Sequence, residues 1–131
     1  MEKISRDEIK KKGIGRFFRS FKYSVDGLIY ALKYEQSIII HAIATVSVII
    51  LGLVFHINRL EWILVLLAIG IILGAELLNT AIEAVVDMVT LEIHPLAKIA
   101  KDTASGSVFV LSIVAAAIGL VVFIPYIIAL F

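Results

Sequence analysis

Polar side chains recur on one face of an otherwise apolar stretch in the second half of the chain: Glu76, Asn79, Glu83 and Asp87. At about 100° per residue they fall within an arc of about 80° on a helix, and Thr80 extends the same stripe. One ionised carboxylate near the middle of a membrane costs about 2.5–3.5 kcal/mol, so several on one stripe need compensation or a function. The stripe therefore predicts bound cations or proton chemistry.

The compensation could come from inside or outside the subunit. No lysine or arginine lies in the apolar spans, so we expect few ion pairs within one subunit, although a purely structural pairing of the acids stays an alternative. Carboxylate oxygens are preferred ligands of Mg²⁺, and Glu35 could supply a second ligand or be a solvated interfacial acid. One three-helix subunit also has too little protein to shield the stripe from lipid, so we expect a homo-oligomer.

Further polar residues stand at the edges of the apolar stretches. Lys101 and Asp102 open the third stretch, and Lys101 could bind a phosphate as a point charge or could extend to the interface. His94-Pro95 indicates the start of a helix, because proline is favoured in the first helical turn. His41, inside the first apolar run, is expected to be a hydrogen-bonded packing residue.

The elements that must position these residues are membrane spans. The chain has 131 residues, of which 61% are apolar, and its mean hydropathy is +1.05. Three stretches reach the ~20 apolar residues that cross a bilayer. We expect a single all-α membrane domain over 1–131, with spans at about 35–55, 62–90 and 103–130.

The first quarter of the chain is basic. Residues 1–34 carry nine Lys/Arg and four Asp/Glu, and apolar side chains recur at helical spacing over about 14–33. This pattern predicts an amphipathic helix on the membrane surface, with residues 1–13 disordered or frayed. The positive-inside rule then places the N-terminus in the cytoplasm and the C-terminus outside, in a multi-pass protein of the plasma membrane.

Several function classes are excluded or disfavoured. The chain has no cysteine, so disulfides, thiolate nucleophiles and cysteine zinc sites are absent. It has no GxxxxGK[ST] loop and no kinase-type GxGxxG, so nucleotide chemistry would need an unrelated site. The basic residues favour the membrane surface, and we expect no nucleic-acid partner. A proton- or cation-coupled transporter remains an alternative, because intramembrane acids also mark ion pathways.

Three segments carry a resemblance to a known family. The runs 75–87 (AELLNTAIEAVVD) and 92–102 (EIHPLAKIAKD) closely resemble the signature of the prokaryotic diacylglycerol kinases, as do 22–28 (KYSVDGL) and Glu35. The resemblance covers nearly the whole chain from about Arg16. It implies a homotrimer of three-span subunits, each with an amphipathic surface helix, and active sites at the cytoplasmic interface that are shared between subunits.

The resemblance also implies roles for individual residues in ATP- and Mg²⁺-dependent phosphorylation of a lipid alcohol. Glu76 would be the general base, supported by Asn79, and Glu76 and Asp87 would face the lipid substrate. Glu35 and Glu83 would bind Mg²⁺. The residues expected at ATP are Arg16, Tyr23, Glu35, Glu83, Glu92, His94, Lys101 and Asp102.

The sequence of residues 92–102, together with His41, is most similar to the undecaprenol kinase branch of the family. We therefore expect undecaprenol to be converted to undecaprenyl phosphate, with diacylglycerol converted to phosphatidic acid as the alternative. Ser37 and Ile39 depart from that branch, since they stand where Asn and Arg are expected. The departure bears on the lipid contacts of the first span.

Overall fold

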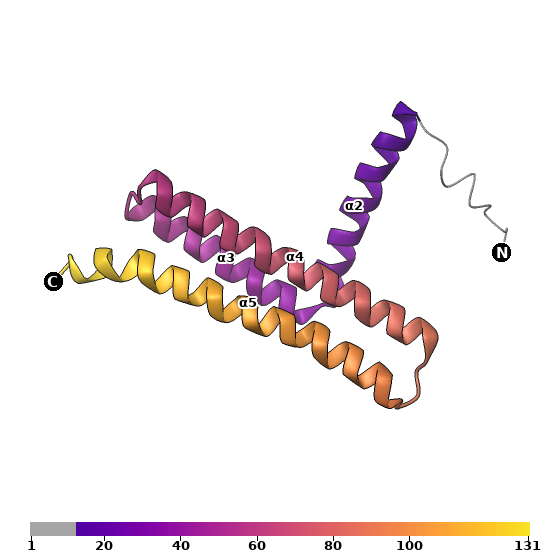
Figure 1. Cartoon of the computed structure of the whole chain (residues 1–131). Helices are drawn as coiled ribbons and strands as arrows, with labels where there is room; N and C mark the ends of the chain where they lie inside the picture. Colours follow the sequence, from indigo (N-terminus) through magenta and orange to yellow (C-terminus); the bar gives the residue numbers. More distant parts are fainter. Residues whose placement is uncertain (1–12) are drawn as a thin grey trace. The chain divides into compact units, whose positions relative to one another are not determined.

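The computed structural model describes residues 13–131 and shows four helices (Figure 1). They are α2 (Ile14–Tyr34), α3 (Gln36–Val54), α4 (Arg59–Val89) and α5 (Pro95–Ile128). No strand occurs between residues 13 and 131, so the all-helical prediction is confirmed for this part of the chain. The expectation for residues 1–12 lies outside the described residues. The chain divides between Tyr34 and Glu35 into two compact units.

The first unit contains α2, a helix of 21 residues. Its aromatic side chains Phe17, Phe18 and Phe21 are exposed, and the rings of Phe17 and Phe21 contact each other edge to face, with centroids 5.1 Å apart. These rings are the side chains that a helix lying in the headgroup region would insert among lipids. That location is a prediction from the sequence.

The second unit is a bundle of three apolar helices, each long enough to cross a membrane. At 1.5 Å per residue, the 19, 31 and 34 residues of α3, α4 and α5 span about 28, 46 and 51 Å, against a hydrocarbon thickness of about 30 Å. The end of α4 and the start of α5 therefore continue past the beginning of α3 (Figure 1).

The start of α5 shows how the sequence builds this extension. The helix begins at Pro95, as the His94-Pro95 pair predicts, and the His94 Nδ1 accepts a hydrogen bond from the Leu96 backbone N–H. Two helical turns therefore precede the expected start of the membrane span at residue 103. These turns carry Lys98, Lys101 and Asp102, whose charges suit a headgroup region better than hydrocarbon.

The α3–α4 turn is closed by a side-chain cap and a tight contact. Asn58 accepts hydrogen bonds from the backbone of the first turn of α4, and the Glu61 carboxylate accepts one from the Asn58 N–H. Glu61 also accepts a hydrogen bond from the Tyr126 hydroxyl of α5 at 2.7 Å. A Cβ on Gly52 would lie only 2.8 Å from the Trp62 ring, so α3 can approach α4 here because residue 52 has no side chain.

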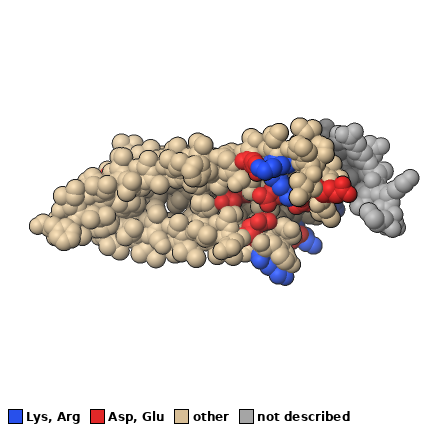
Figure 2. Space-filling model, turned by 90° about the horizontal axis from the view of Figure 1, so that it is seen from below, with Lys and Arg blue, Asp and Glu red and all other residues tan. Residues whose placement is uncertain are grey.

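Two apolar clusters hold the bundle together. One lies near this turn and is built on four buried residues, Ile57, Val65, Val122 and Phe123. The other joins α4 to α5 through Ile72, Ala75 and Val108, directly beside position 76. Figure 2 shows a long uncharged expanse on the face of the bundle that is visible there, with acidic and basic side chains gathered beyond it. This expanse is suited to contact with lipid or with other membrane helices.

Candidate active site

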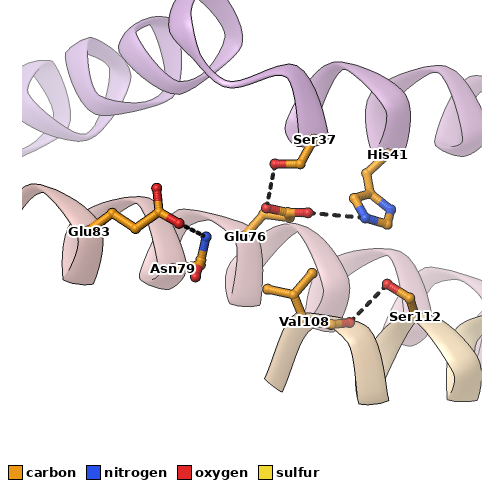
Figure 3. A network of polar contacts seen from close by, with 7 residues as sticks. All are labelled: Ser37, His41, Glu76, Asn79, Glu83, Val108 and Ser112. Carbon is orange, nitrogen blue, oxygen red and sulfur yellow. Dashed lines mark hydrogen bonds and ion pairs between the residues drawn. The ribbon is translucent and has the colours of Figure 1, made fainter. Parts of the chain in front are cut away.

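Glu76 is the centre of the candidate site. It is 2% exposed and is the one buried polar residue in the part of the chain that the structure describes. The Ser37 hydroxyl donates a hydrogen bond to Glu76 Oε2 at 2.8 Å, and His41 Nε2 lies 3.1 Å from Glu76 Oε1 (Figure 3). Both carboxylate oxygens thus have a partner on α3. A buried carboxylate needs such partners, because removing it from water is otherwise costly.

Two findings bear on the expectations for Glu76. Few ion pairs were expected within one subunit, and Glu76 has one contact of this kind, with His41 of α3. One subunit also shields this carboxylate, because α3 covers it on one side and the Ala75 cluster lies against α5 on the other. The expected homo-oligomer therefore cannot be argued from exposure of Glu76.

Sequence reasoning did not assign Ser37 and His41 to the site. His41 was expected to be a hydrogen-bonded packing residue, and its contact with Glu76 was not foreseen. A signal was available: Ser37, His41 and Thr45 follow at intervals of four residues, so they form a polar row on one face of an otherwise apolar helix. Such a row, opposite an acidic stripe on the next span, favours contacts between the two helices.

Asn79 and Glu83 form a second polar pair on α4, on the side of Glu76 nearer Val89. The Asn79 Nδ2 donates a hydrogen bond to Glu83 Oε1 at 3.1 Å (Figure 3). The Asn79 Oδ1 is buried, and no hydrogen-bond partner for it is found among the described residues. Glu83 lies seven positions after Glu76, which corresponds to about 10 Å along the helix. The pair therefore presents an unused amide oxygen beside a carboxylate.

These oxygens are of the type that Mg²⁺ binds. Within residues 13–131, however, no group of three or more His, Cys, Asp or Glu side chains is arranged to hold a metal ion. Mg²⁺ normally takes only one or two carboxylates from a protein and completes its shell with water and substrate phosphates. The donors around Glu83 fit an ion of that kind, held jointly with a phosphate.

A third group of predicted residues lines a pocket of about 280 Å³ between the end of α4 and the start of α5. It brings together the expected residues Asp87, Glu92, His94, Lys101 and Asp102. The Lys101 ammonium pairs with Asp87 Oδ1 at 2.6 Å, and the Lys98 ammonium contacts the Asp102 carboxylate. The pocket thus offers cations, acids and exposed loop backbone at one end of the bundle.

The remaining predicted residues lie elsewhere. Asp87 lies eleven residues beyond Glu76, about 16 Å along α4, so these two expected substrate residues are not adjacent. Glu35 is half-buried and directly precedes α3, with an extended backbone (φ −104°, ψ 112°) and no capping hydrogen bond from its side chain. Arg16 and Tyr23 lie on α2, in the first compact unit, whereas the other predicted site residues lie in the second unit.

Fold and site together define a small multi-pass membrane protein with a paired carboxylate inside its bundle and a charged pocket at one end. The model of the prokaryotic diacylglycerol kinase family matches residues 22–123. The chain belongs to this family, as the resemblance in the sequence predicted. It is therefore a lipid kinase, with ATP as the phosphate donor and a membrane lipid as the acceptor, and the transporter alternative is set aside.

Similar proteins are named either undecaprenol kinase or diacylglycerol kinase. Over 112 residues the chain is 41% identical to the undecaprenol kinase of Bacillus subtilis (strain 168), covering 86% of this chain and 91% of that protein. Over 112 residues it is 36% identical to a diacylglycerol kinase of Synechocystis, covering 85% of this chain and 64% of that protein. A diacylglycerol kinase of Helicobacter pylori (strain J99) is 39% identical over 98 residues, covering 75% of this chain and 77% of that protein.

Proposed function

We propose that this lipid kinase phosphorylates undecaprenol with ATP and Mg²⁺, and that Glu76 is its general base. The observation that carries the proposal is the buried Glu76 carboxylate, which lies inside an apolar bundle and has a partner on each oxygen. A general base must be fixed within hydrogen-bond reach of the proton it accepts. In the proposal, the fixed Glu76 carboxylate receives the hydroxyl proton of a lipid that reaches it from the membrane.

In the proposed reaction the lipid hydroxyl hydrogen-bonds to Glu76. Its oxygen attacks the γ-phosphorus of ATP in line, the bond between the β,γ-bridging oxygen and the γ-phosphorus breaks, and ADP leaves. The hydroxyl proton passes to Glu76. Phosphoryl transfer needs little covalent chemistry from the protein, so positioning and charge stabilisation supply most of the catalysis.

Glu35 and Glu83 are the proposed Mg²⁺ ligands, with the Asn79 amide beside Glu83. A bound Mg²⁺ supplies charge neutralisation at the phosphate oxygens. The unpartnered Asn79 Oδ1 supports this assignment, because a buried carbonyl oxygen without a donor is costly unless a ligand uses it. The same Asn79 side chain holds Glu83 through its Nδ2.

The pocket at the α4–α5 connection is the proposed nucleotide site. Lys101 would exchange its contact with Asp87 for one with a phosphate, which is also a charge-assisted partner. Asp102, Glu92 and His94 would contact the rest of the nucleotide. Arg16 and Tyr23 of α2 are proposed to contact ATP on the strength of the family resemblance in the sequence alone.

The proposed lipid rests on the similarity to the Bacillus subtilis undecaprenol kinase and on the apolar side chains at positions 38–40, at the start of α3. A polyprenol presents one hydroxyl on an apolar tail, whereas diacylglycerol adds two ester carbonyls that need donors. Ile38, Ile39 and Ile40 offer no side-chain donor, and the Ser37 hydroxyl already donates to Glu76. Each ester carbonyl left unpaired and buried would cost about 1–3 kcal/mol.

The test is kcat/KM for undecaprenol and for diacylglycerol in the same mixed micelles, at matched surface concentration. The proposal predicts the higher value for undecaprenol. A higher value for diacylglycerol would reverse the substrate assignment and leave the kinase activity untouched.

We also propose that the enzyme is a homotrimer with shared sites, N-terminus in the cytoplasm and C-terminus outside. Gly70 and Gly74 support the assembly: a Cβ on either would meet nothing within 4 Å in the subunit, so this small-residue face is open to a neighbouring helix. Mass measurement of the detergent complex tests the trimer, and a fully active monomer would contradict it.

A further inference from the structure

The contacts of Glu76 extend the site to α3. Ser37 and His41 lie four residues apart in α3, so both side chains reach the same turn of α4. One contacts each oxygen of the same carboxylate, at 2.8 and 3.1 Å (Figure 3). This arrangement fixes the plane of the carboxylate as well as its position, which a single hydrogen bond would not do.

The arrangement leaves the carboxylate able to accept a proton. Two carboxylate oxygens offer about four lone-pair sites. Ser37 and His41 occupy one on each oxygen, so the remaining sites can accept the hydroxyl of a lipid. The two contacts from α3 thus orient Glu76 and leave lone pairs of its carboxylate unused.

We infer that Ser37 and His41 are positioning residues of the phosphoryl transfer: they hold the Glu76 carboxylate in the orientation that receives the lipid hydroxyl proton. The inference rests on the proposed role of Glu76 as the base. Neither residue needs to touch the lipid or the nucleotide, because each acts through Glu76. They should therefore control kcat and leave the affinity for ATP unchanged.

The surroundings of His41 allow this inference to be tested by substitution. A cavity of about 240 Å³ between α3, α4 and α5 is lined by His41, Thr45 and Ser112 together with small and aliphatic side chains. A leucine or glutamine at position 41 has room to fit beside it. Ser112 lines the same cavity but donates its hydroxyl to the Val108 carbonyl of its own helix at 2.8 Å, so it provides a matched control (Figure 3).

The experiment compares variants that keep or remove a hydrogen-bond donor. Ser37→Ala and His41→Leu remove the donors, whereas Ser37→Thr and His41→Gln keep one, and Ser112→Ala is the control. Misplacing a reacting group by about 1 Å can cost on the order of 100-fold in rate, so we expect kcat to fall roughly 10- to 100-fold without a donor. The KM for ATP should stay within about twofold, and Ser37→Thr and His41→Gln should recover most of kcat.

The result that overturns the inference is wild-type kcat in both Ser37→Ala and His41→Leu, or equal losses in the variants with and without a donor. Thermal unfolding in detergent identifies a variant that fails to fold. If a His41 variant does not fold, the comparison rests on Ser37→Ala and Ser37→Thr. Glu76→Gln distinguishes a failure of the proposed base from a failure of the proposed positioning residues. If Glu76→Gln keeps wild-type turnover, the proposed base is wrong. If it is inactive while the α3 variants are fully active, the positioning inference alone fails.

Discussion

Replacing Asn79 by alanine should raise the Mg²⁺ requirement of the enzyme without weakening the bundle. The substitution removes the 3.1 Å hydrogen bond from Asn79 Nδ2 to Glu83. A hydrogen bond to a charged group contributes about 1.5–3 kcal/mol, and a tenfold change corresponds to about 1.4 kcal/mol. The Mg²⁺ concentration for half-maximal activity should therefore rise roughly 10- to 100-fold, the range observed when groups that orient metal ligands are lost.

The effect of Asn79→Ala on stability should be different. The substitution also removes the buried Asn79 Oδ1, whose lack of a partner costs about 1–3 kcal/mol. This gain offsets the lost hydrogen bond, so the free energy of unfolding should stay within about 1 kcal/mol of wild type.

The assay for Asn79→Ala is a Mg²⁺ titration of lipid phosphorylation at saturating ATP, beside unfolding of the same preparation in detergent. Thr80→Ala is the control, because it changes a polar side chain of the same turn but neither member of the pair. An unchanged Mg²⁺ midpoint would refute the proposed role of Asn79. If Asn79→Ala loses stability and activity in parallel, Asn79 is a structural residue and not one that orients the Mg²⁺ ligand.

Three further predictions concern the metal, the nucleotide and the fold. Glu35→Ala and Glu83→Ala should each raise the Mg²⁺ midpoint, and unchanged midpoints in both would defeat the ligand assignment. Lys101→Met should raise the KM for ATP roughly 10- to 100-fold, because it removes a charged partner of phosphate, and an unchanged KM would exclude that contact. Gly52→Val should lower the free energy of unfolding by about 1–3 kcal/mol, because its side chain would overlap Trp62; wild-type unfolding in detergent would contradict this packing.

The helices of the bundle could be predicted because their signals are local. Long apolar runs indicate spans by their length and composition, and residues 13–131 contain three helices of that kind. The start of α5 follows from His94-Pro95, because a proline in the first turn and a side-chain cap depend on residues next to each other in the sequence. Placement of Glu76, Asn79 and Glu83 on one stripe needed only the helical repeat.

The partners across helices could not be predicted in the same way. Ser37 and His41 are 39 and 35 residues from Glu76, and their contact depends on the register of α3 against α4. The close approach of Gly52 to Trp62 belongs to that register, and a sequence pattern does not specify it. Pairing of Lys101 with Asp87 similarly requires the path of the loop between α4 and α5.

The measurement that tests the central claim most directly is transfer of labelled γ-phosphate from ATP to undecaprenol by wild type and by Glu76→Gln. ATP affinity and the oligomeric state of both preparations are measured alongside. A general base contributes about 10²–10⁴-fold, so Glu76→Gln should lose that much turnover while it still folds and binds ATP. Turnover within about tenfold of wild type would contradict the proposed catalytic role of the buried carboxylate.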